Sequence, residues 1–247
     1  MFVPLWLALQ VLTRIPVPSQ PYPTPQDWGY SVVTYPLVGF LIGLVLVLLH
    51  WLLADTDPGV QAALLLGAWT LITGGIHLKG LANSADAWSG GHADRQRTLE
   101  ILRDPRSGPV AMMVVVITLV MKFAALSVLA AESALEIFLL APVMGRSVMM
   151  AMLMTTPYVV SHDAMGAERA AHVPRQGVIW TLVAVMVGTL LLVSWGGVLL
   201  LLLLLLGGYL IRRMLMQRIG GVTDDTLGGV CELTEAGVLV VVVLVWG

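Results

Sequence analysis

Three segments of this sequence combine carboxylates with glycines, and these segments are where chemistry is most readily expected. They span residues 74–88, 97–108 and 220–235. Carboxylates that are brought close together can bind a cation or exchange protons with a substrate. Ordinary connecting loops need no such concentration of glycine and acid, so these segments are the first candidates for a functional site.

In the second segment, Glu100 and Asp104 are four residues apart and would share one face of a helix. Pro105 favours an end to that helix at about Asp104, because the residue before a proline avoids helical geometry. The alternative is a solvated helix on which Glu100 only pairs with Arg97 or Arg103, a kind of contact that contributes little to stability.

The third segment precedes the last apolar stretch, and a pair of glycines lets the chain turn before it. Thr223, Asp224 or Asp225 is expected at the start of the final helix, where a hydroxyl or carboxylate can cap free backbone N–H groups. Capping alone is therefore one explanation of these residues. Glu232 and Glu235 lie roughly two and three turns further on, and acids at that depth usually face a bundle interior or a wet cavity.

The rest of the chain is apolar, and it predicts the elements that must position these side chains. Of the 247 residues, 58% are hydrophobic and only 11% are charged, compared with about 25% charged residues in ordinary soluble domains. Uninterrupted apolar runs of roughly 20 residues fit transmembrane helices, whereas the strands of a transmembrane barrel would alternate apolar and polar residues. We expect a single all-α, polytopic membrane domain over residues 1–247.

We predict about seven transmembrane helices from the lengths of the apolar runs and the breakers that flank them. Their approximate bounds are 32–54, 60–77, 109–130, 137–156, 177–194, 196–211 and 226–246. The apolar stretch before Arg14 is short for a span and contains Pro4, so we interpret it as an N-terminal re-entrant or interfacial helix.

The basic residues are distributed unevenly between the connections. Eleven of the 13 Lys and Arg residues fall in alternate connections, and the opposite connections contain Asp and Glu but no Lys or Arg. Since cytoplasmic loops carry the excess of basic residues, the three carboxylate segments are expected on the cytoplasmic side. The other two basic residues, Lys122 and Arg146, lie within spans, where the cost of a buried charge predicts a structural pair or a contact with a ligand.

Global charge and cysteine content exclude several classes of function. The net charge of −2 and the pI of about 6.2 provide no basic field for a nucleic acid. The single cysteine, Cys231, excludes an intrachain disulfide framework and a cysteine-rich metal site.

Five segments resemble the cobalamin synthase family, whose members are also called adenosylcobinamide-GDP ribazoletransferases. The segments are residues 12–18, 35–39, 73–91, 98–108 and 220–232. The most specific pattern is His77-Leu78-x-Gly80-Leu81-Ala82-x-x-x-Asp86, accompanied by Leu99-x-Ile101-x-x-Asp104 and by Gly220-Gly221-x-Thr223-x-Asp225-x-Leu227-Gly228. The resemblance runs over nearly the whole chain.

The resemblance implies phosphoryl transfer at a bacterial inner membrane. In this reaction the ribose 3'-hydroxyl of α-ribazole, or of its 5'-phosphate, attacks the cobinamide-bound phosphate of adenosylcobinamide-GDP. GMP leaves, adenosylcobalamin or its 5'-phosphate is formed, and Mg²⁺ is the expected cofactor. Such a transfer needs neutralisation of phosphate charge and hard oxygen ligands for the metal. Membrane lipid and a second copy of the chain are further candidate partners.

The resemblance also assigns candidate roles to individual residues. The candidates for catalysis are His77, Asp86, Asp104 and Asp225. The candidates for substrate binding are Arg103, Arg106, Arg146 and Thr223, and those for metal binding are Asp86, Glu100, Asp104, Asp225 and Glu232. We expect the acids to converge on one phosphate-sized site, because a metal ion needs several oxygen ligands.

Two positions depart from the family's first motif, which normally has aspartate at the positions of Lys79 and Asn83. Together with Asp86, those aspartates would lie on one helical face, spaced by four and then three residues. A lysine repels Mg²⁺ and an asparagine offers only a neutral oxygen, so a family member that binds its ligands but catalyses poorly is one alternative. A membrane transporter, in which the carboxylates line a path through the bundle, is the other.

Overall fold

The structure, a computed structural model, describes residues 2–18, 22–104, 106–159 and 164–246. In these ranges it consists of helices and their connections, apart from an isolated bridge between Tyr158 and Val222. The helices are α1 (Val3–Leu12), α2 (Pro25–Val33), α3 (Tyr35–Leu52), α4 (Pro58–Thr73), α5 (Ile76–Gly90), α6 (Arg95–Arg103), α7 (Pro109–Ala131), α8 (Leu135–Thr155), α9 (Ala164–Ala171), α10 (Arg175–Arg218) and α11 (Asp224–Trp246). The predicted all-α fold class is confirmed.

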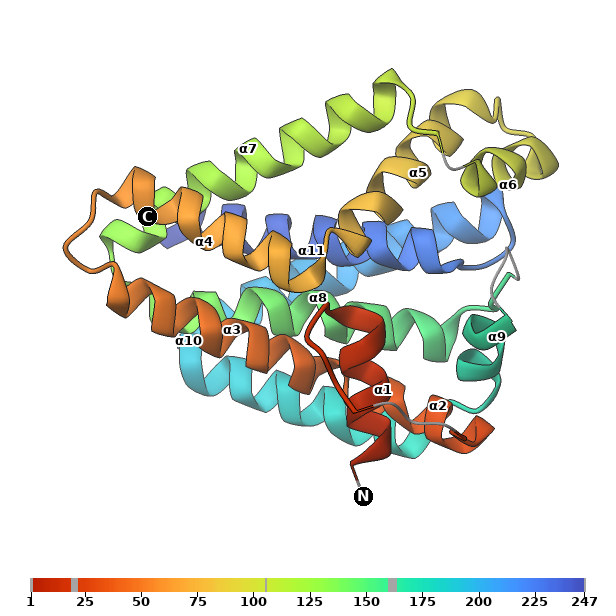
Figure 1. Cartoon of the computed structure of the whole chain (residues 1–247), viewed down its shortest axis with the longest axis horizontal. Helices are drawn as coiled ribbons and strands as arrows, with labels where there is room; N and C mark the ends of the chain where they lie inside the picture. Colours follow the sequence, from red (N-terminus) through yellow and green to blue (C-terminus); the bar gives the residue numbers. More distant parts are fainter. Residues whose placement is uncertain (1, 19–21, 105, 160–163, 247) are drawn as a thin grey trace.

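The long helices form an elongated bundle (Figure 1). In the described part of the chain, α3, α7, α8, α10 and α11 are each long and apolar enough to cross a membrane. The helix α8 packs against α3, α10 and α11, and α11 also packs against α5 and α7. Because most of α8 and α11 is buried, they form the centre of the bundle, while α7 and α10 expose apolar side chains that suit contact with lipid.

The longest helix, α10, is two helices joined at Ser194, whose backbone (φ 51°, ψ −131°) is not helical. Gly197 lies against the preceding half, since an added Cβ would be 3.1 Å from the Thr189 carbonyl oxygen. The chain therefore folds back close to the predicted boundary between the spans 177–194 and 196–211. By length and composition, five described helices, or six if α4 and α5 count as one span, could cross a membrane. The total of seven stays a prediction.

A sharp bend of 86° separates α4 from α5. Gly74 and Gly75 have positive φ angles of 63° and 66°, which glycine adopts without the steric cost of a Cβ atom. The side chain of Arg14 also packs so closely on Gly74 that a Cβ there would displace it. The predicted span 60–77 is therefore wrong at its end, because α4 stops at Thr73 and His77 belongs to the first turn of α5.

Short helices cover the end of the bundle at which α3 begins. The ten-residue helix α1 packs against α2 and α3 and is too short to cross a bilayer. Its re-entrant or interfacial position stays a prediction. The predicted span 32–54 starts too early, because α2 ends at Val33 and α3 begins at Tyr35. The eight-residue helix α9 was not predicted, since so short a helix leaves little periodic pattern.

Candidate active site

The first and third carboxylate segments meet where α5 packs against α11. The contact is made through glycines: a Cβ added at Gly80 would lie 2.5 Å from the Asp225 carbonyl oxygen, and one at Gly228 would lie 3.1 Å from the His77 Cα atom. Small residues allow such close approach of helices in membranes. The glycines of both motifs therefore bring the start of α11 against the first half of α5.

Asp86 links the first segment to the second. Its half-buried carboxylate accepts hydrogen bonds from the backbone N–H groups of Gly108 at 2.5 Å and Ala111 at 2.8 Å, at the start of α7. Gly108, the capping residue of α7, has no side chain to fill this role, so Asp86 caps the helix from α5. The carboxylate that was predicted as a metal ligand thus already has one backbone donor on each oxygen.

Helix α6 ends at Arg103 with Asp104 as its C-cap, close to the predicted end at about Asp104, but Glu100 and Asp104 have different partners. The Asp104 carboxylate accepts two hydrogen bonds from the Arg106 side chain, at 2.8 and 3.0 Å, and a third from the Arg106 backbone. These bonds lower the pKa of Asp104 to about 2. Glu100 is exposed and pairs with Arg97 at 3.4 Å, as the alternative of a solvated helix expected.

The start of α11 is held by its own cap and by an arginine of α9. The fully buried Thr223 accepts a hydrogen bond from the Thr226 N–H group with its hydroxyl, so the predicted capping role is confirmed. Asp224 pairs with Arg169 through bonds of 2.9 and 3.0 Å, and Arg169 also donates to the Tyr35 hydroxyl at 3.2 Å. The substrate-binding role proposed for Thr223 would have to share a hydroxyl that already acts as a cap.

The charged residues within the spans pair with one another. The Lys122 ammonium lies 2.5 Å from a carboxylate oxygen of both Glu232 and Glu235, and 4.5 Å from the centre of the Trp69 ring. Arg146 binds the other oxygen of Glu235. All four charged side chains are at most 5% exposed. Glu232 and Arg146, candidate ligands for metal and phosphate, thus have ionic partners inside the protein.

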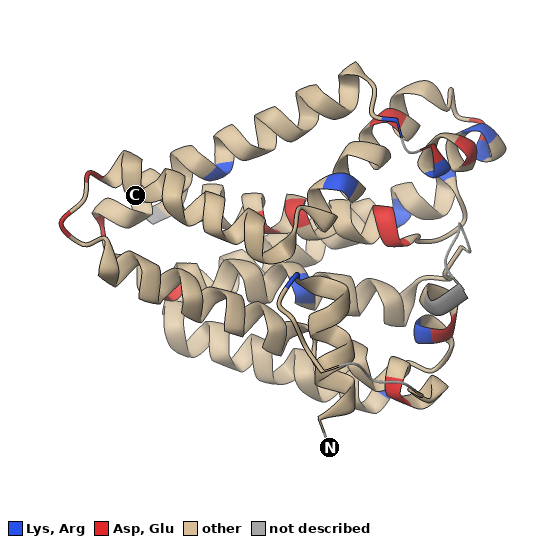
Figure 2. Ribbon diagram, viewed as in Figure 1, with Lys and Arg blue, Asp and Glu red and all other residues tan. Residues whose placement is uncertain are grey.

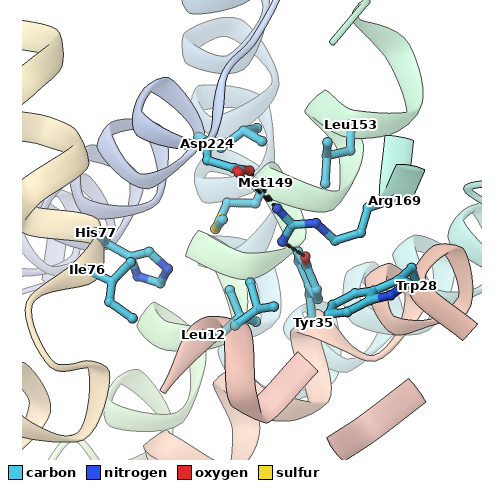
Figure 3. A pocket seen from close by; sticks show the side chains of 11 residues that line it. Leu12, Trp28, Tyr35, Ile76, His77, Met149, Leu153, Arg169 and Asp224 are labelled. Carbon is cyan, nitrogen blue, oxygen red and sulfur yellow. Dashed lines mark hydrogen bonds and ion pairs between the residues drawn. The ribbon is translucent and has the colours of Figure 1, made fainter. Parts of the chain in front are cut away.

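A cavity of about 260 Å³ lies beside these groups, between α1, α3, α5, α8 and α11 (Figure 3). Its walls are mainly apolar, with Trp28 and Tyr35 as aromatic members. His77 lines the cavity on one side, and the ion pair of Arg169 with Asp224 lies across from it. In this way the cavity places a candidate catalytic residue opposite charged groups from α9 and α11.

The remaining candidates are spread along the same end of the bundle. Arg103 and Arg106 are exposed near the start of α7, and Asp225 is half-buried in the first turn of α11. In the described part of the chain, no three His, Cys, Asp or Glu side chains are arranged to hold a metal ion. The convergence of all five candidate ligands on one metal stays a prediction.

The sequence profile of the cobalamin-5-phosphate synthase family matches residues 4–243. The chain belongs to this family. It is 44% identical over 237 residues to an adenosylcobinamide-GDP ribazoletransferase of Pseudomonas putida (strain W619), which covers 96% of this chain and 97% of the relative. A relative of the same name from Pseudomonas entomophila (strain L48) is 46% identical over 238 residues, with the same coverage of both chains. No solved structure gives a significant match.

Membership of the family confirms the resemblance seen in the sequence motifs. It also favours a transferase over both alternatives, a transporter and a member that only binds its ligands.

Sequence reasoning missed the two aromatic residues and the arginine of the cavity wall: Trp28, Tyr35 and Arg169. A signal existed for one of them, because Tyr35 opens the segment 35–39 that resembles the family. Nothing local indicated Arg169, whose partner Asp224 lies 55 positions further along the chain. Such a contact depends on how α9 docks, which the pattern of a short helix does not contain.

Proposed function

We propose that this chain transfers the cobinamide phosphate of adenosylcobinamide-GDP to α-ribazole or to its 5'-phosphate, with release of GMP. The observation that carries the proposal is the match of the family over residues 4–243. Its geometric support is the contact of α5 with α11, which joins two of the family's motifs. The multi-pass helical bundle fits a reaction on a substrate held at a membrane.

The proposed site lies at the end of the bundle that carries α6 and α9, facing the cytoplasm of a bacterial inner membrane. Most basic residues gather at this end (Figure 2). We assign the exposed Arg103 and Arg106 to the phosphates of the GDP group, because guanidinium groups bind phosphate oxygens with two parallel hydrogen bonds. Arg106 would exchange its surface pair with Asp104 for the nucleotide.

We retain Mg²⁺ as the proposed cofactor because phosphoryl transfer needs neutralisation of charge on the phosphate oxygens. The described side chains do not fit a site built from protein ligands alone, since no three of them are arranged around an ion. Mg²⁺ is commonly held by one or two carboxylates together with substrate phosphates and water. Most ligands of the ion would therefore come from the substrate phosphates and water.

The chain's own residues supply positioning. The cap that Asp86 places on α7 fixes α5 against the segment that carries Arg106. The ion pair between Arg169 and Asp224 fixes the start of α11, next to Asp225. Fixed geometry matters because transfer between two bound substrates gains much of its rate from alignment of the attacking and leaving oxygens.

Release of GMP from adenosylcobinamide-GDP tests the proposal. The purified chain in lipid nanodiscs should release GMP only when α-ribazole and Mg²⁺ are both present. Asp225→Asn should lower the rate by about 100-fold or more if Asp225 accepts the proton of the attacking hydroxyl or holds Mg²⁺, on the scale of general-base catalysis. Asp55→Asn is the matched control, because Asp55 is an exposed acid in the α3–α4 connection at the opposite end.

Absence of GMP release under all conditions would contradict the proposed function. Equal rates for Asp225→Asn and the unmodified chain would remove Asp225 from the site and leave the function in place. We also propose that membrane lipid surrounds the chain and that the chain forms a homo-oligomer. The mass of the nanodisc complex measures how many copies of the chain it contains.

A further inference from the structure

The cavity between α1, α3, α5, α8 and α11 is small, mainly apolar and lined by one histidine. Its deep wall is formed by fully or nearly fully buried side chains, among them Leu12, Met149, Leu153 and Leu227. Cavities of roughly 300–1,000 Å³ hold ligands of drug size, and this one has a volume of about 260 Å³. It therefore suits a flat, apolar part of a substrate better than a whole nucleotide.

The tautomer of His77 follows from its neighbour. Nη2 of Arg146 lies 3.4 Å from Nδ1 of His77, and both side chains are buried. A guanidinium group has only donors, so Nδ1 must accept this contact and the ring proton must reside on Nε2. The ion pair with Glu235 keeps Arg146 in this position.

The Nε2–H group of His77 is left as a buried donor. It is shielded from solvent and has no hydrogen-bond partner among the described residues. Buried donors in proteins are nearly always satisfied. Nε2–H lies just behind the cavity surface that His77 lines, so a small shift of the ring would bring it to an acceptor bound in the cavity. The imidazole, which is 2% exposed, extends toward the cavity from the start of α5 (Figure 3).

We propose that this cavity binds the base of the ribazole substrate, and that Nε2–H of His77 donates a hydrogen bond to the ring nitrogen that does not carry the ribose. The inference rests on the proposed function. Ribazole contains a dimethylated benzimidazole, a flat bicyclic ring with two nitrogens, one of them bonded to the sugar. The base therefore offers one hydrogen-bond acceptor and two methyl groups. These features match the single donor of His77 and the apolar wall of the cavity. His77 is then a binding residue for the base. It keeps its Nε2 proton and donates a hydrogen bond with it.

The place of Asp224 in the cavity wall is consistent with this orientation. Asp224, whose side chain is 41% exposed, lines the cavity at the start of α11. That is where Gly80 of α5 lies against the Asp225 backbone. A base held by His77 would direct its ribose toward the junction of the two family motifs.

Binding of two nucleosides tests the inference without any need for turnover. The first is α-ribazole, and the second is its indole analogue, in which a C–H group replaces the accepting nitrogen. Equilibrium dialysis against the full chain in nanodiscs should show about tenfold tighter binding of α-ribazole, the usual scale for one buried hydrogen bond. His77→Phe should bring the ratio close to one.

Two further variants separate the hydrogen bond from general damage to the fold. His77→Gln keeps an N–H donor near the position of Nε2 and should retain the preference for α-ribazole. His50→Phe is the matched control, because His50 is also buried and has an unpartnered ring nitrogen, but does not line the cavity. It should leave the ratio unchanged.

The inference is overturned if His77→Phe discriminates between the two nucleosides as well as the unmodified chain does, or if neither nucleoside binds. GMP release, measured in parallel, separates this result from the proposed function. If GMP is still released but the preference for α-ribazole does not depend on His77, only the proposed base site is contradicted. A His77-dependent preference without GMP release supports the base site and contradicts the transferase.

Discussion

Lys122, Arg146, Glu232 and Glu235 are charged side chains buried inside the bundle, where a charge without a partner is costly. Two cations face two anions, so the cluster has no net charge and each charged side chain has an opposite partner. Removing one member of a buried pair leaves the other uncompensated, which costs far more than the pair itself contributes. The cluster thereby ties α7, α8 and α11 together, and through Arg146 it also orients His77.

Lys122→Met should destabilise the protein strongly, because it leaves Glu232 and Glu235 with only Arg146 for compensation. We expect a loss of about 3–5 kcal/mol in the free energy of unfolding. Denaturant unfolding followed by circular dichroism in a fixed detergent measures the change. Lys122→Met combined with Glu232→Gln should recover most of the loss, since it removes one charge of each sign.

Arg97→Met is the control for that prediction. The pair of Arg97 with Glu100 is exposed, with side chains 62% and 50% accessible, and such pairs contribute only about 0–1 kcal/mol. A loss for Lys122→Met as small as that for Arg97→Met would show that the buried cluster is not held as the structure describes.

Lys79→Asp together with Asn83→Asp should raise both the affinity for Mg²⁺ and the rate of GMP release. Lys79 is exposed, Asn83 is 6% exposed and Asp86 is half-buried, all on one side of α5. The double change adds two anionic ligands and removes a cation, and charges a few ångströms apart interact strongly even when partly screened. The Mg²⁺ concentration for half-maximal GMP release should fall by at least about tenfold.

Lys79→Ala serves as the comparison for this pair of substitutions, because it removes the cation without adding a ligand. It should produce a smaller gain. If the doubly substituted and unmodified chains release GMP at equal rates over the whole range of Mg²⁺, both positions lie outside the metal shell. The family's use of those positions would then not apply to this chain.

The bend between α4 and α5 shows that a few residues can change the direction of the chain. An apolar run that continues through Ile76 and Leu78 predicted one span to residue 77. The structure instead turns by 86° after Thr73. The cause is the pair of glycines with left-handed backbone, against which Arg14 packs. The bend moves His77 from the end of a span to the wall of the cavity.

Alanine substitutions at three glycines test this explanation of the bend. Gly75→Ala should cost about 1–2 kcal/mol, the strain of a left-handed backbone with a Cβ atom. Gly74→Ala should cost more, because the new Cβ also displaces the Arg14 side chain. Gly67→Ala lies within α4 with open space around it, and should be neutral or stabilising by up to about 1 kcal/mol.

Denaturant unfolding measures all three variants under one condition. An equal effect of Gly74→Ala and Gly67→Ala would mean that the bend does not depend on the left-handed conformation. Reduced binding of α-ribazole by Gly74→Ala alone would connect the bend to the shape of the cavity.

Elements with a strong local pattern were predictable, and their contacts were not. The break near residue 195, the end of α6 at Arg103 and the cap of α11 follow from short-range preferences of the chain. The partners of Asp86 and Lys122 lie 22 to 113 positions away. Those pairings are decided by helix packing, which a periodic sequence pattern does not specify.

Across the whole molecule, charge is divided between the two ends of the bundle. The connection between α3 and α4 carries acidic residues without basic ones, while most Lys and Arg lie at the end with α6 and α9 (Figure 2). The exposed candidates Arg103 and Arg106, and Asp224 in the cavity wall, lie at that basic end. The sequence anticipated this polarity because it depends only on which connection a residue occupies.

The final prediction is that the basic end faces the cytoplasm. The only cysteine, Cys231, is fully buried, so the native chain offers almost no background to a membrane-impermeant thiol reagent. Arg97→Cys, on exposed α6, should react only after the cells are permeabilised, whereas Asp55→Cys should react in intact cells. This orientation is expected because loops rich in Lys and Arg stay on the cytoplasmic side during insertion. It would also place Asp224 and the cavity that it lines on the side where a nucleotide substrate is available. Labelling of Arg97→Cys in intact cells, with protection of Asp55→Cys, would reverse the topology and separate the proposed site from the cytoplasmic supply of its substrate.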